Sequence, residues 1–261
     1  MTSLFKYSFN TFNNMQSSIN SGEFTLSDVL IFLRNPAYTE SNKFGTYSNL
    51  RYLAWSYLFS FLGVIIVTLA MFLIDKLIVN YFETASVYSQ FRESSRNIKT
   101  SFGGHKFLIV AVIGPLLEEI IFRLPLNAKK YSVALAVAIL VFRLSGNSFV
   151  NFYFTKSSLI GLSCSCLAFM LINRYLSSSW LENIREKHFY LWFYAVVIIF
   201  GLVHIDNISN IKYNLLLIYP IFVMPQMLIG VFIGNLRVQR GFFWGFLLHV
   251  LINSTSLFLS S

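Results

Sequence analysis

The stretch Gly114-Pro-Leu-Leu-Glu-Glu-Ile-Ile-Phe-Arg123 places two adjacent carboxylates and an arginine inside a long run of apolar residues. A charged side chain at the centre of a bilayer costs about 2.5 kcal/mol or more, so it is retained where it faces a protein interior or a wet cavity. Such residues usually take part in chemistry or transport. We therefore expect other segments of the chain to supply polar partners for Glu118 and Glu119.

The composition indicates a helical membrane protein. Of the 261 residues 56% are hydrophobic and only 12% are charged, against about 25% charged in a soluble domain. The net charge of +9 lies mainly in the connections between apolar segments, as the positive-inside rule requires. We therefore expect the lipid bilayer, and not nucleic acid, as a partner. Cys164 and Cys166 share one apolar segment and are expected to be small core residues, with neither a disulfide nor a metal site.

The fold class that follows is an all-α, polytopic transmembrane bundle. A crossing helix needs about 20 mostly apolar residues, and the chain offers about seven such segments, with six or eight as alternatives. The segment 131–149 is short enough to be re-entrant instead of crossing. The predicted crossings are 52–74, 105–126, 131–149, 157–175, 188–204, 213–236 and 241–259.

The sequence divides into a polar and amphipathic N-terminal segment, 1–51, and a transmembrane domain, 52–261. Residues 1–22 have no sustained periodicity, whereas 25–28 resemble a capping box before a short amphipathic helix that Asn35-Pro36 ends. Residues 75–100 and 181–187 are predicted to be polar connections. No cleavable signal is expected, so 52–74 is a retained first crossing. The distribution of Lys and Arg favours a cytoplasmic N terminus in an integral multi-pass protein of the plasma membrane.

Two further apolar segments contain histidine, in Phe200-Gly-Leu-Val-His204 and in His249-Val-Leu-Ile-Asn253. Residues four apart share a helix face, so each motif presents its residues together toward a common interior. Each histidine alone could be a structural hydrogen-bonding group between helices.

The charged pair in the first motif has a structural interpretation of its own. Glu119 and Arg123 are four residues apart and are predicted to form an ion pair. Glu118 then lacks a local cation. A carboxylate in that setting is suited to act as a general base.

The three motifs together resemble those of the CAAX protease and bacteriocin-processing family, also called the Abi family. That family carries Glu-Glu-x-x-x-Arg, Phe-x-x-x-His and His-x-x-x-Asn or His-x-x-x-Asp in this order, and the chain has all three on separate apolar segments. The resemblance covers residues 105–260 and leaves out the first 100 residues. It implies an intramembrane, glutamate-dependent endopeptidase that hydrolyses a membrane-associated peptide or a CAAX-type protein and needs no cofactor.

The resemblance also implies the roles of the motif residues. Glu118 acts as general base and His204 helps to hold the water. His249 and Asn253 donate hydrogen bonds to the oxyanion. Supporting positions are the ion-paired Glu119 and Arg123, which orient the motif helix, and Phe200, which packs one turn below His204.

The spacing of the motifs departs from the family pattern. The first and second motifs are farther apart than in the family, so 131–176 looks like an insertion of two segments. Glu118 and His204 both fall late in their segments, which antiparallel helices would place at different depths. Tilt, a kink at Pro115 or a re-entrant 131–149 would resolve this conflict.

The sequence is also compatible with other mechanisms and functions. Zinc could bind Glu118, His204 and His249, although the usual His-Glu-x-x-His motif is absent. Ser254 and Ser256 adjoin the third motif, but serines in such helices usually bond their own backbone. A non-proteolytic membrane scaffold or bacteriocin-immunity protein could use the same fold. A transporter would be expected to show inverted repeats, and the sequence shows none.

Overall fold

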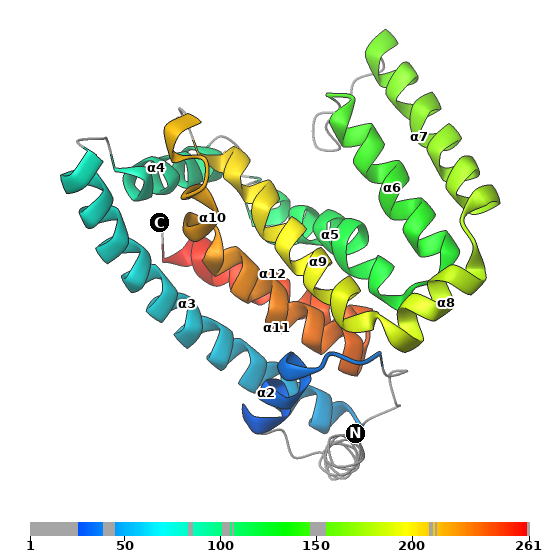
Figure 1. The fold of residues 1–261 in the computed structure, drawn as a ribbon, viewed down its shortest axis with the longest axis horizontal. Helices are drawn as coiled ribbons and strands as arrows, with labels where there is room; N and C mark the ends of the chain where they lie inside the picture. Colours follow the sequence, from blue (N-terminus) through cyan, green and yellow to red (C-terminus); the bar gives the residue numbers. More distant parts are fainter. Residues whose placement is uncertain are drawn as a thin grey trace.

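The computed structural model describes residues 26–38, 45–82, 86–100, 105, 107–146, 155–208, 211 and 213–259. Every secondary-structure element in these residues is helical, which confirms the all-α class (Figure 1). The prediction for residues 1–22 lies outside the described residues. So does the capping-box threonine at position 25.

Three described helices are long and apolar enough to cross a membrane, over residues 46–81, 156–175 and 189–207. They correspond to α3 (Thr46–Phe82), α7 (Lys156–Tyr175) and α9 (Phe189–Leu202), the last continued by the 3-10 helix η5 (Val203–Asn207). The helix α12 (Phe242–Phe258) is apolar but shorter. These helices support a membrane protein, and the count of seven crossings stays a prediction.

The helix that carries Glu118 and Glu119 is irregular, and Pro115 lies within it. It begins with π turns, η2 (Phe107–Ile113), continues as α5 (Gly114–Glu118), and returns to π geometry in η3 (Glu119–Arg123) before the 3-10 turn η4 (Leu124–Asn127). Pro115 lacks a backbone N–H and so cannot donate the hydrogen bond of a regular helix. We call residues 107–127 the motif helix.

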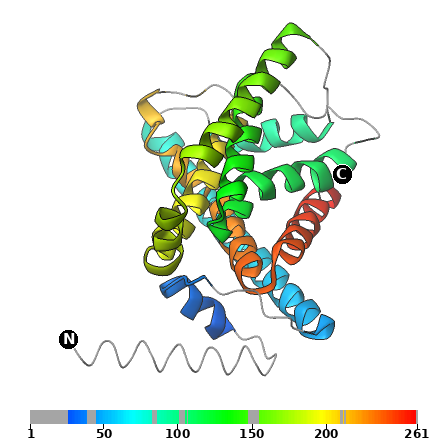
Figure 2. The ribbon, with the colours of Figure 1, turned by 90° about the vertical axis from the view of Figure 1, so that its right-hand side faces the viewer.

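The predicted insertion forms a helical hairpin. The chain reverses at Ala128, which has a φ of 50°, and the Asn127 side chain accepts a hydrogen bond from the Lys129 N–H at 2.9 Å. The helix α6 (Lys130–Leu144) then packs mainly on α7 and touches the end of the motif helix. Figure 1 shows the two helices side by side, and in Figure 2 the end of α7 extends beyond the other helices.

Both predicted polar connections contain helices. The helix α3 continues through Asp75 to Phe82, and α4 (Val87–Thr100) follows it. The buried Asp75 carboxylate joins the two, because it accepts hydrogen bonds from Ser86 Oγ at 2.6 Å and from the Tyr88 N–H at 3.0 Å. Residues 181–187 likewise belong to a helix, α8 (Ser178–Lys187). Short amphipathic helices of this kind lack the long apolar run of a crossing.

The segment 213–236, which was predicted to be one crossing, is not one continuous helix. This region contains the short helices η6 (Tyr213–Leu215) and α10 (Tyr219–Phe222), and only then α11 (Met224–Arg240). Pro220 and Pro225 lie in the first turns of α10 and α11, where the missing N–H is tolerated and a new helix can start.

The core is built around α11. The helices α3, α9 and α12 all pack against it, and Ile233 and Leu236 of α11 are fully buried. The predicted amphipathic helix is confirmed as α2 (Leu26–Arg34), which docks on α9 through an edge-to-face pair between Phe32 and Phe193. Cys164 and Cys166 are exposed on α7 and not in the core, because α7 packs mainly on α6, which covers only one side of it.

Candidate active site

The structure brings the four predicted catalytic residues to one cavity. Glu118, His204, His249 and Asn253 all line a space of about 370 Å³. The motif helix packs along α12 and touches α9 near its end, so Glu118 and His204 meet although both fall late in their segments. The predicted conflict in depth is therefore absent from the structure.

His249 lies between the two carboxylates of the first motif. Its Nδ1 is 3.0 Å from Glu119 Oε1, and its Nε2 is 3.5 Å from Glu118 Oε2. The shorter contact has the distance of a hydrogen bond, whereas the longer one exceeds the usual range. A carboxylate that accepts from Nδ1–H fixes the orientation of the ring and leaves Nε2 for chemistry. Glu119 thus aims His249 Nε2 toward Glu118.

The predicted ion pair between Glu119 and Arg123 is confirmed. Arg123 Nη1 lies 3.6 Å from Glu119 Oε1, and both side chains are at most 1% exposed. By contrast, the side chain of Glu118 is 33% exposed. Glu119 therefore serves two partners in the protein interior, while Glu118 remains open to the cavity.

The ring of Phe200 joins the three motifs. The Arg123 guanidinium lies 3.5 Å above its centroid, and the rings of His204 and His249 meet it edge to face, at 4.9 and 6.1 Å between centroids. His204 Nδ1–H also donates to the Phe200 carbonyl at 2.8 Å. This bond fixes the orientation of the His204 ring and leaves the other ring nitrogen, Nε2, for contacts in the cavity.

Asn253 shares the cavity with His249, as their spacing predicted. Its Nδ2 donates to the Val110 carbonyl in the π turns of the motif helix at 3.0 Å. A side-chain amide carries two N–H donors, so this bond holds Asn253 in place with a second donor remaining.

Several residues that line the cavity were not predicted as site residues, and Ser256 was considered only for a serine mechanism. Asn207 and Ser256 each follow a predicted residue by three positions, a spacing that places them on the same helix face. Gln226 is a polar residue within an apolar stretch, and Phe91 comes from α4, which was predicted to be a connection.

The structure also describes the residues that a serine mechanism or a zinc mechanism would use. Ser254 Oγ donates to the Val250 carbonyl of its own helix at 2.7 Å, as expected of a serine in an apolar helix. Among the described residues, no group of three His, Cys, Asp or Glu side chains is arranged to hold a metal ion.

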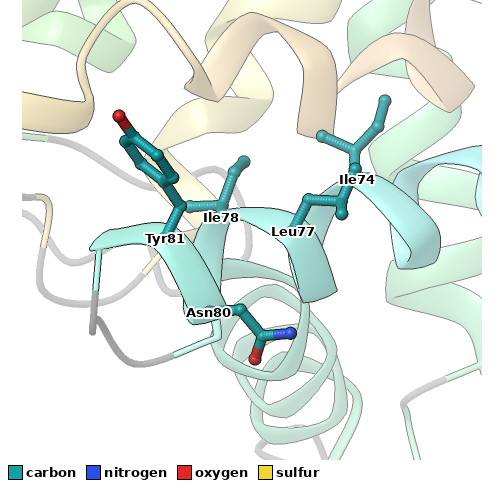
Figure 3. Close-up of a pocket in the computed structure, with 5 residues that line it drawn as sticks. All are labelled: Ile74, Leu77, Ile78, Asn80 and Tyr81. Atoms are coloured by element: carbon teal, nitrogen blue, oxygen red, sulfur yellow. The ribbon is translucent and has the colours of Figure 1, made fainter.

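A second hollow lies along the end of α3. Its volume is about 460 Å³, and the side chains that line it all come from one helix. In Figure 3, Asn80 points away from Tyr81 and Ile78. The lining contains neither a carboxylate nor a histidine, which makes the first cavity the candidate active site. The lining residues are Ile74, Leu77, Ile78, Asn80 and Tyr81.

Comparisons of the chain with protein-family models, curated proteins and solved structures find no match. The geometry of the cavity is therefore the basis for assigning a function.

Proposed function

We propose that the chain is an intramembrane endopeptidase of the CAAX protease and bacteriocin-processing type, acting on a membrane-associated peptide or CAAX-type protein. The observation that carries this proposal is the convergence of Glu118, His204, His249 and Asn253 on one cavity. These residues come from three separate parts of the chain. Their order and spacing resemble the three motifs of that family.

Peptide hydrolysis needs an activated water and stabilisation of the developing oxyanion. Glu118 takes a proton from a water that His204 holds, and the water oxygen attacks the scissile carbonyl carbon. The proton then passes from Glu118 to the leaving nitrogen as the C–N bond breaks. The products are a new carboxyl terminus and a new amino terminus.

His249, with both ring nitrogens protonated, and Asn253 act as the oxyanion donors, through Nε2–H and Nδ2–H. Their positions are maintained by the 3.0 Å contacts of His249 with Glu119 and of Asn253 with Val110. Donors held in place before the reaction stabilise charge without reorganising. Glu119 and Arg123 thus support the oxyanion site as well as the motif helix.

For topology we propose seven crossings, a cytoplasmic N terminus and a location in the plasma membrane. The basic residues in the connections support this orientation. The hairpin of α6 and α7 adds two crossings, so it preserves the relative direction of the motif-bearing helices.

The experiment that tests the proposal compares peptide termini by mass spectrometry in membranes with wild-type protein or with Glu118→Gln. Wild type should produce new termini that the variant lacks, because an amide cannot accept the proton. The matched control is Glu182→Gln on α8, whose side chain is 61% exposed and which should behave as wild type.

Identical termini from wild type and Glu118→Gln at equal expression would contradict proteolysis and support the scaffold or immunity function. A zinc chelator applied to a parallel wild-type sample tests the mechanism. If the chelator abolishes cleavage, a metal held by Glu118, His204 and His249 replaces the glutamate scheme.

A further inference from the structure

Gln226 presents an unpaired polar atom at the candidate active site. It lies in the first turn of α11, directly after Pro225, and lines the cavity with Glu118 and His204. Its Oε1 is buried and has no hydrogen-bond partner among the described residues. A buried acceptor without a partner is unfavourable, and in a functional site it indicates a group that a ligand completes.

The neighbouring residues of α11 show which way this face of the helix is turned. Ile229 lines the same cavity three residues later, and Gly230 packs where an added Cβ would lie 2.9 Å from the Phe200 ring. Residues at these spacings share one helix face. The face of α11 that carries Gln226 is therefore turned toward the catalytic side chains.

We propose that Gln226 binds the substrate backbone, with its side-chain carbonyl accepting a hydrogen bond from a peptide N–H near the scissile bond. This inference rests on the proposed endopeptidase function. Glu118, His204, His249 and Asn253 act on the water and the scissile carbonyl, whereas a peptide in the cavity also buries N–H donors. Interior N–H groups of an α-helix are already paired. The substrate class is thus a peptide segment that is extended at the cleavage site.

The test uses an internally quenched fluorescent peptide, whose sequence comes from the wild-type-dependent termini and which is embedded in detergent micelles. Gln226→Leu should raise KM by about tenfold, the effect of losing one buried hydrogen bond, with kcat within about twofold of wild type. Gln226→Glu keeps an acceptor oxygen and should retain more affinity than Gln226→Leu. Gln239→Leu, a buried position of the same helix away from the cavity, should leave KM unchanged.

A second set of peptides assigns the partner atom. Each carries one N-methyl group in place of one backbone N–H. For wild type, KM should rise about tenfold when the N-methyl group is at one particular position. For Gln226→Leu, the same peptide should cause no further rise in KM. Uniform sensitivity of wild type and Gln226→Leu at every position would overturn the inference.

Stability of the ligand-free protein provides an independent readout. Removal of an unpaired buried acceptor should raise the unfolding temperature of Gln226→Leu by about 2 °C. A lower unfolding temperature would identify Gln226 as a structural residue and overturn the inference. If wild type and Glu118→Gln produce the same termini, the endopeptidase itself fails; if wild type cleaves and Gln226→Leu has the same KM, only the Gln226 assignment fails.

Discussion

Glu119 contacts both Arg123 and His249, so one side chain links the stability of the protein to the geometry of the site. One oxygen, Oε1, contacts both Arg123 Nη1 and His249 Nδ1. All three side chains are at most 3% exposed. A buried charge of this kind is stabilised by its ion-pair partner, because water does not reach it to take the partner's place.

Arg123→Met should therefore destabilise the protein by about 3–5 kcal/mol, since it leaves Glu119 buried without its cation. A double variant, Glu119→Leu with Arg123→Met, removes both charges and should recover most of that loss. It should not recover cleavage, because His249 Nδ1 has lost its acceptor. Thermal unfolding in detergent and cleavage of the same quenched peptide measure the two effects.

An Arg123→Met variant that is as stable as wild type would contradict this assignment. A double variant that regains full cleavage would show that Glu119 does not position His249. Glu182→Gln again serves as the control, since its ion pair with Arg185 is largely exposed and such pairs contribute little.

At the scale of helices, the crossing of α9 and α11 depends on small residues. An added Cβ at Gly201 would lie 2.2 Å from Met227 Cγ, and one at Gly234 would lie 2.8 Å from the Phe193 ring. Small residues let helix backbones approach closely within a membrane. This close approach brings Phe200 and the start of α11 to the candidate active site.

Gly230→Ala should disturb this crossing where it supports the catalytic groups. The new Cβ would lie 2.9 Å from the Phe200 ring and 3.2 Å from Arg123 Nη2. Overpacking of this kind costs about 1–3 kcal/mol, and a shift of about 1 Å at the site can reduce cleavage about a hundredfold.

Gly63→Ala on α3 is the matched control, because the three atoms nearest to its Cβ all belong to the flexible Leu228 side chain. It should retain cleavage and stability. Equal activity of both alanine variants would mean that the crossing tolerates expansion and does not position Phe200.

The limits of sequence prediction follow from the same helices. Spacing of four residues correctly paired Glu119 with Arg123 and placed His249 beside Asn253, because helix periodicity is local. Which adjacent glutamate bonds His249 could not be predicted, since the π turns on either side of α5 change how each residue is rotated. The tertiary contact of Glu119 with His249 has no local signal.

At the scale of the whole molecule, many large apolar side chains on the described helices are exposed. On α3, Ile66 and Leu77 are 67% and 69% exposed, and on α7, Ile160 is 63% exposed. Exposed apolar side chains that gather on one helix mark contact with lipid or another protein. Polar groups gather instead at the interior cavity. This distribution supports a bilayer around α3 and α7.

The native cysteines test this placement for α7. Cys164 and Cys166 are exposed near the middle of a 20-residue helix, about 12 Å or more from either end. If α7 crosses the bilayer, a membrane-impermeant thiol reagent applied to both sides should modify neither cysteine until the protein is denatured. Lys187→Cys in a chain with both native cysteines replaced by alanine should react readily, because Lys187 is exposed at the end of α8.

Rapid modification of Cys164 and Cys166 in intact membranes would contradict the crossing of α7 and place the hairpin in water. The predicted number of crossings would then fall from seven to five. Because α6 and α7 add or remove crossings as a pair, the relative direction of the motif helix, α9 and α12 would not change. The labelling result therefore decides the position of the hairpin independently of the catalytic proposal.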